Sequence, residues 1–187
     1  MIRPIRIYGD QVLHQRAQQV TAFDQELSDL VRDMFETMKS APGVGLAAPQ
    51  VGVALQVFVY DYPDDDDNPR RGVVINPTII IGPVSEEEPD EELHSEGCLS
   101  VPGERFSLQR ADWAVIEGVD LEQKPIRIEA EGWFARIFQH EFDHLEGIIY
   151  VDKLPEDAKK EAFEVMAELG WNRPGQSWLP GTDHLED

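Results

Sequence analysis

The stretch QHEFDHLEG, residues 139–147, decides how the middle of this chain folds and what it binds. His140 and His144 are four residues apart, so on a helix they share one face, roughly 5 to 6 Å apart between their Cβ atoms. Two imidazoles at this spacing can bind one cation, and the carboxylate of Glu141 can reach a water there without being a ligand. The HExxH pattern therefore predicts a helix that carries a metal site. The alternative is two histidines and a solvated glutamate on a helix surface.

The HExxH pattern supplies two ligands and leaves the third open. Downstream of it, the spacing leaves three candidates, none of them compelling: Glu161, Glu164 and His184. Upstream, EGCLS at residues 96–100 contains the only cysteine of the chain, Cys98. A thiolate and two imidazoles would leave one coordination position free for water, as a catalytic metal site requires. Cys98 is therefore a candidate ligand, although a lone cysteine is in general more often an inert core residue.

A glycine-rich segment, GVGLAAPQ at residues 43–50, is the third motif. Gly43 and Gly45 allow the backbone to approach a ligand closely, and the amide of Gln50 can donate a hydrogen bond to an oxyanion. Taken alone the segment is weak evidence, because an ordinary loop after a helix can have the same composition.

Apolar periodicity predicts three helices. Residues 24–39 have apolar side chains at spacings of three and four, and either Thr21 or Asp24 can cap the start. Residues 133–147 contain the HExxH pattern, and residues 156–169 form a third, amphipathic segment.

Four segments are predicted to be extended: residues 55–61, 72–81, 113–121 and 125–133. The last two form a predicted hairpin, because they are joined by a short turn at 122–124 and apolar residues alternate with charged ones in the second. Strands and helices do not alternate regularly along the chain. This order favours an α+β fold with mostly antiparallel sheets around the central HExxH helix, with an N-terminal helix and a C-terminal helix.

We predict one domain over residues 1–187, with a core at 3–153 and a C-terminal helix and tail at 154–187. The tail after residue 169 shows no clear element. No stretch resembles a signal peptide or a membrane span, so the chain is predicted to be cytoplasmic.

The formal net charge is −21, from 16 Lys and Arg against 37 Asp and Glu. Such acidity argues against a phosphate-binding surface, and hence against direct nucleic-acid binding. Two runs concentrate the acids, at residues 61–67 and 86–92. Solvated acidic loops are the favoured interpretation of these runs over a docking site or a trap for divalent cations.

Together, GVGLAAPQ, EGCLS and QHEFDHLEG, in this order and about 40 to 50 residues apart, resemble the three signature motifs of peptide deformylases. The resemblance extends over roughly residues 3–153, and the tail motif GWNRPGQSWLPG is similar to the C-terminal segment of actinobacterial members. It implies a monomeric metallohydrolase that removes the formyl group from the N-terminal methionine of newly made polypeptides and releases formate. Its partners would be nascent N-formylmethionyl peptides, with at most a transient contact to the ribosome.

The resemblance also implies a role for each matching residue. One divalent metal ion, natively Fe²⁺ and replaceable by Zn²⁺, Ni²⁺ or Co²⁺, would be bound by three ligands: Cys98, His140 and His144. Glu141 would be the general acid and base. Gln50 and the backbone N–H of Leu99 would bind the developing oxyanion, and Gly45 would contact the substrate backbone.

The predicted HExxH helix adds a candidate pocket for the methionine side chain. Three of its residues share the face of His140 and, with Val44, are expected to line this pocket: Trp133, Arg136 and Ile137. Core packing is the alternative for Trp133 and Ile137. Arg136, together with Arg105, is expected to meet substrate carbonyls or a carboxylate.

Around the ligands, we expect Glu96 to pair with Arg110, and Asp143 to orient a ligand histidine. Two other functions are compatible with such a metal site. One is a metallo-endopeptidase, and the other is a non-catalytic metal-binding or ribosome-associated factor.

Overall fold

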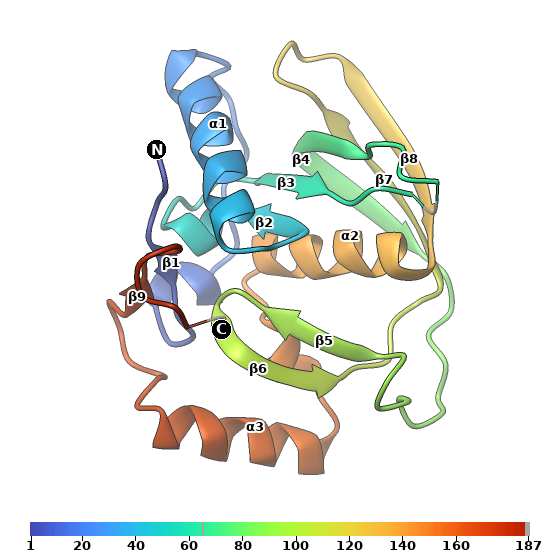
Figure 1. The fold of residues 1–187 in the computed structure, drawn as a ribbon. Helices are drawn as coiled ribbons and strands as arrows, with labels where there is room; N and C mark the ends of the chain where they lie inside the picture. The colour runs from blue at the N-terminus through green and yellow to red at the C-terminus, as the bar shows by residue number, and fades with distance from the viewer. Residues whose placement is uncertain (65, 186–187) are drawn as a thin grey trace.

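The structure is a computed structural model that describes residues 1–64 and 66–185. A helix, α2 (Gly132–Leu145), runs through the middle of the molecule, with sheets and loops on several sides of it (Figure 1). Ten of its side chains are buried, so it is a core helix rather than a surface one. The predicted α+β fold around a central HExxH helix is confirmed.

The largest sheet has five strands in the order β2-β3-β4-β7-β8, and every neighbouring pair is antiparallel. Its strands are β2 (Gly45–Ala47), β3 (Val57–Asp61), β4 (Arg71–Ile81), β7 (Trp113–Val119) and β8 (Pro125–Glu131). The four predicted extended segments correspond to β3, β4, β7 and β8. The predicted hairpin is confirmed, because β7 pairs with β8 across a turn in which Gln123 has a φ of +61°.

Helix α1 (Gln25–Ser40) begins as its sequence predicts. The carboxylate of Asp24 accepts a hydrogen bond from the backbone N–H of Leu27 at 3.1 Å, so Asp24 and not Thr21 is the cap. Helix α3 (Glu156–Glu168) follows Pro155 and contacts β6. All three predicted helices are therefore present, with ends that differ by at most two residues.

Two smaller sheets were not predicted. Strands β5 (Ser95–Cys98) and β6 (Val101–Ser107) form an antiparallel ribbon that contains the EGCLS motif. Strand β1 (Ile5–Arg6) pairs with β9 (Ser177–Trp178), so the expectation that the tail has no element was wrong. Short 3-10 turns complete the chain: η1 (Gln11–His14), η2 (Ala48–Val51) and η3 (Tyr150–Lys153).

The core fixes α2 against the large sheet. The helix contacts all five strands of that sheet, and the rings of Phe58, Phe134 and Phe138 lie 4.5 to 5.9 Å apart between neighbouring centroids. All three side chains are buried, and each contributes roughly 1.5 to 3 kcal/mol through removal of apolar surface from water. Because this face of α2 is held by the sheet, the position of the histidines on another face is fixed as well.

The first acidic run begins with Asp61, the last residue of β3. Asp64 accepts hydrogen bonds from the backbone N–H and the side-chain amide of Asn68 at 2.8 and 3.0 Å. Asp65, in that run, and residues 186–187, at the end of the predicted domain, lie outside the described residues. None of the described helices has the length and apolar content needed to cross a bilayer.

Candidate active site

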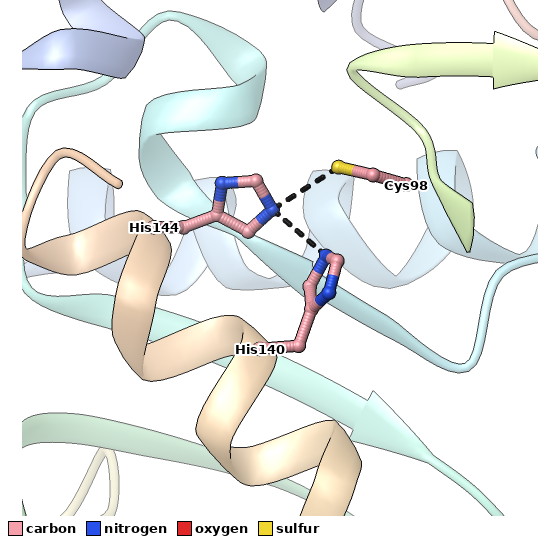
Figure 2. Close-up of side chains that lie close together, drawn as sticks. All are labelled: Cys98, His140 and His144. Atoms are coloured by element: carbon pink, nitrogen blue, oxygen red, sulfur yellow. Dashed lines mark hydrogen bonds between the residues drawn. The ribbon is translucent and has the colours of Figure 1, made fainter. Parts of the chain in front are cut away.

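Three candidate ligands meet between α2 and the β5–β6 ribbon. Helix α2 places the rings of His140 and His144 one turn apart, and Cys98 lies at the end of β5 (Figure 2). The Nε2 atom of His144 is 3.1 Å from Nε2 of His140 and 3.4 Å from Sγ of Cys98. All three side chains are buried, and their ligand atoms lie within 4.8 Å of one another.

These distances fit one metal ion. Tetrahedral bonds of about 2.0 to 2.1 Å to nitrogen and about 2.3 Å to sulfur place neighbouring ligand atoms roughly 3.3 to 3.6 Å apart. Within residues 1–64 and 66–185, this is the only group of three or more His, Cys, Asp or Glu side chains that converges in this way. The three downstream candidates for the third ligand are not part of it: Glu161, Glu164 and His184.

The charges of the cluster also favour a cation. Burial lowers the pKa of His144 well below its ordinary value, so this imidazole is neutral, as a metal ligand must be. Burial acts to lower the pKa of His140 too, but Cys98 and Glu96 together raise it well above its ordinary value. Both neighbours of His140 therefore favour positive charge at this position.

A buried carboxylate fixes the orientation of His140. Glu96 Oε1 lies 2.6 Å from Nδ1 of His140, which leaves Nε2 to face the cluster. Arg110 donates to both oxygens of Glu96 at 2.7 and 2.8 Å, so the predicted pairing of Glu96 with Arg110 is confirmed. Burial acts to raise the pKa of Glu96, but Arg110 and His140 outweigh it and hold that pKa well below its ordinary value.

One predicted contact is indirect in the structure, and another is not tested by it. Asp143 was expected to orient a ligand histidine; its carboxylate binds Arg110 at 2.8 Å and Lys153 at 2.9 Å, and it reaches His140 through Arg110 and Glu96. Arg136 lies against the cleft, yet one guanidinium nitrogen donates to Glu96 at 2.9 Å and to the Leu108 carbonyl at 2.7 Å. Its expected contact with substrate carbonyls stays a prediction.

Glu141 is buried without a partner for one oxygen. The side chain is 4 % exposed, and Oε2 makes no hydrogen bond with the described residues. Burial raises the pKa of Glu141 to about 7, within the range useful to a general base. Gly45 makes this arrangement fit, because a Cβ at that position would overlap the Glu141 carboxylate.

The glycine-rich motif places an amide beside the cluster. Gln50 is 1 % exposed, and its Oε1 accepts a hydrogen bond from the Ala47 backbone N–H at 2.9 Å. This bond turns the donor nitrogen Nε2 toward Cys98 Sγ at 3.7 Å and toward Ser100 Oγ at 3.3 Å. The donor therefore lies next to the candidate ligands.

A cleft of about 440 Å³ opens over the cluster, and nearly all of the predicted site residues line it. They are Val44, Gly45, Gln50, Cys98, Leu99, Arg105, Trp133, Arg136, Ile137, His140 and Glu141. The exception is His144, which is 1 % exposed and lies behind them. Sequence reasoning missed Tyr62, which lies in the first acidic run, and Glu104, which lies on β6. A larger crevice of about 1170 Å³ shares Tyr62 and Trp133 with the cleft but contains none of the ligands.

A cysteine and an HExxH helix whose side chains could hold a metal ion, with a buried carboxylate and amide beside an open cleft, are typical of a metal-dependent hydrolase. The sequence model of the polypeptide deformylase family matches residues 2–160. The chain therefore belongs to the peptide deformylase family, whose members are hydrolases that remove the N-formyl group from newly made polypeptides.

Individual relatives match most of the chain. A peptide deformylase of Rhodococcus opacus is 47 % identical over 97 % of this chain and 94 % of its own. The crystal structure of a peptide deformylase from Legionella pneumophila has a TM-score of 0.78 at 38 % identity, covering 91 % of this chain and 96 % of its own. A class I type b peptide deformylase from Acinetobacter baumannii, solved with Met-Ala-Ser bound, has a TM-score of 0.71 at 33 % identity. The match covers 82 % of this chain and 99 % of that one.

Proposed function

We propose that Cys98 Sγ and the Nε2 atoms of His140 and His144 bind one divalent metal ion, and that Glu141 carries the proton transfers of deformylation. The observation that carries this proposal is the unpartnered Oε2 of Glu141, buried in the cleft beside the first histidine ligand. When bound, the ion would supply Lewis acidity, which makes water a nucleophile near neutral pH.

The proton route then follows from the position of Glu141. Its carboxylate takes a proton from the attacking water, whose oxygen forms a bond to the formyl carbon. The same carboxylate returns the proton to the nitrogen as the bond between carbon and nitrogen breaks. Formate leaves, together with a peptide that has a free amino terminus. A pKa of about 7 suits both steps, because the group must accept and then donate one proton.

The carbonyl oxygen of the formyl group needs hydrogen-bond donors as it becomes negatively charged. We assign Gln50 Nε2 and the backbone N–H of Leu99 to the negative charge that develops on this oxygen. Gln50 is held by Ala47, so its amide needs no reorientation during the reaction. Gly45 would meet the peptide backbone of the substrate, where a larger residue would displace Glu141.

The substrate would be an N-formylmethionyl peptide, with the methionine side chain in the slot formed by Val44, Trp133 and Ile137. The relative from Acinetobacter baumannii binds Met-Ala-Ser, the kind of peptide that remains after a formyl group is removed. Arg105 is exposed at the edge of the cleft and is assigned to the carbonyls beyond the methionine. Arg136 is assigned to the wall of the slot.

Fe²⁺ is the proposed native ion, with Zn²⁺, Ni²⁺ or Co²⁺ as replacements, because one soft thiolate and two imidazoles suit all four. We further propose that residues 1–187 form one domain that acts as a cytoplasmic monomer on nascent chains, with at most a transient ribosome contact. The pairing of β1 with β9 supports one domain, since it joins the two ends of the described chain.

Formate release from formyl-Met-Ala-Ser, with metal analysis of the same sample, tests the function. The full chain should release one formate per peptide and leave acetyl-Met-Ala-Ser intact. After anaerobic loading with Fe²⁺, Zn²⁺, Ni²⁺ or Co²⁺, the protein should contain one metal ion per chain. Each ion should restore activity, and Fe²⁺ should restore the most. Peptide-bond cleavage seen by mass spectrometry would instead indicate an endopeptidase, and no formate from the Fe²⁺-loaded protein would refute the proposal.

A further inference from the structure

The C-terminal tail is a fixed part of the fold beside the site. Trp178 in β9 pairs with Ile5 in β1, and its side chain is 3 % exposed within the core. The two strands lie side by side in Figure 1, next to the turn of the β5–β6 ribbon. The match to the family's sequence model ends at residue 160, so this tryptophan lies beyond it.

The indole of Trp178 is linked to a candidate metal ligand through one peptide group. Its Nε1–H donates to the Leu99 carbonyl at 2.8 Å. That carbonyl and the N–H of Ser100 belong to the same planar peptide unit. The Ser100 N–H in turn donates to Cys98 Sγ at 3.4 Å. Indole, peptide and sulfur therefore form a series of hydrogen bonds, in which each bond polarises the next.

Other contacts hold the same segment. The backbone N–H of Tyr8 donates to the Ser100 carbonyl at 2.8 Å, and Gln50 Nε2 approaches Ser100 Oγ at 3.3 Å. Ser100 is fully buried. The peptide on the other side of Leu99 carries the N–H that we assign to the oxyanion. Rotation of the Leu99–Ser100 peptide would therefore break the sulfur contact and change ψ of Leu99, the residue whose N–H we assign to the oxyanion.

We propose that Trp178 is a positioning residue for the deformylase reaction: its indole N–H fixes the Leu99–Ser100 peptide, and through it the Cys98 sulfur and the Leu99 N–H. For its effect on turnover this inference rests on the proposed function. Packing alone needs the ring and not its N–H group. The N–H group is what distinguishes a positioning role from simple filling of the core.

The test replaces Trp178 by Phe, which keeps an aromatic ring and removes the N–H group. With formyl-Met-Ala-Ser, W178F should lower kcat by about 10- to 100-fold, the range typical of residues that orient metal ligands, and change KM by less than about twofold. The sulfur-to-metal charge-transfer band of the Co²⁺-loaded variant should be shifted relative to that of the Co²⁺-loaded parent. In the metal-free variant, the Ser100 amide should exchange with solvent at least about tenfold faster.

Two further variants separate position from packing. Trp171 lies in the same tail and packs against the core, so Trp171→Phe removes an indole N–H with no effect expected on the band or on kcat. Trp178→Ala should lower the melting temperature more than W178F but lower kcat by a similar factor. If W178F equals the parent in kcat, band position and Ser100 exchange while W178A is impaired, Trp178 only fills space and the proposal is overturned.

The readouts also separate the two proposals. A parent protein that releases no formate would refute the proposed function. The cobalt band and the Ser100 exchange rate would still report whether the indole reaches the sulfur. An unshifted band together with unchanged exchange refutes the positioning role even if the parent is active.

Discussion

Two buried glutamates next to His140 have opposite surroundings. Glu96 lies at the centre of a charge network, where it accepts three hydrogen bonds from Arg110 and Arg136 and contacts the ring of His140. Glu141 faces the cleft with one oxygen unpartnered. The pKa of Glu96 is held well below its ordinary value by Arg110 and His140 against the effect of burial, whereas burial raises the pKa of Glu141 to about 7.

The difference shows how one residue type performs two tasks in one site. Donors around Glu96 stabilise its charge, so it keeps a fixed orientation and can hold a ligand in place. Among the described residues, Oε2 of Glu141 has no hydrogen-bond donor, and burial raises the pKa to about 7, so the proton can be held and released near neutral pH. Substitutions that change the surroundings of Glu96 should therefore have different effects from substitutions that remove Glu141.

The largest expected effect comes from removing the proton carrier. Glu141→Gln should lower kcat by about 100- to 10,000-fold, because an amide cannot take the proton of the attacking water. Metal content should stay at the parent's level, measured by elemental analysis of the same sample. Glu146→Gln, near the end of the same helix and paired with Arg16 at the surface, is the matched control and should keep kcat within about twofold. Loss of metal in E141Q would identify Glu141 as a ligand instead.

The next largest effect should come from breaking the network. Glu96→Gln leaves the guanidinium groups of Arg110 and Arg136 buried without their shared anion, which costs about 3 to 5 kcal/mol of unfolding free energy. Metal affinity should fall by about 10- to 100-fold, because His140 loses the acceptor that orients it. Denaturant unfolding and competition with a chelator measure the two effects.

The control for this change is an exposed ion pair of the same kind. Glu117 on β7 binds Arg127 at 2.6 Å with both side chains more than half exposed. Glu117→Gln should cost less than about 1 kcal/mol, since solvent screens such pairs. Equal losses in E96Q and E117Q would contradict the role given to burial around Glu96.

The smallest effect is a dependence of stability on pH. Because the folded-state pKa of Glu141 is about 7 and its ordinary value is 4.5, ionisation favours the unfolded chain between these pH values. Below about pH 4.5 both states are protonated and the parent should match E141Q. The metal-free parent should then lose about 3 kcal/mol of unfolding free energy relative to E141Q as the pH rises through 7. No further change is expected above about pH 8. A constant difference would place the Glu141 pKa near its ordinary value.

Much of the fold could be predicted because its main elements have long, regular patterns. The apolar spacing of α1 and α3, the HExxH helix and the β7–β8 hairpin each extend over enough residues to be recognised. Strands β5 and β6 were missed because they contain Gly97, Pro102 and Gly103 within a short polar stretch. Strand β9 has two residues, too few for any periodic signal.

The candidate site could be predicted where its residues belong to local motifs. The third candidate ligand was proposed through the EGCLS motif, because Cys98 is 46 residues from His144 and no spacing rule connects them. Contacts between single pairs of residues far apart in the sequence could not be predicted. Arg136 binds Glu96 40 residues away, and the indole of Trp178 reaches the Leu99 carbonyl 79 residues away.

The number of residues between Cys98 and His144 also determines how long after the cysteine the second histidine is synthesised. At about 5 to 20 residues per second, the 46 residues between them take roughly 2 to 9 seconds to make. During that interval the thiol exists without the histidines that lie beside it in the folded chain. Trp178 is added later still, so the surroundings of the cysteine are completed only after residue 178 has been made.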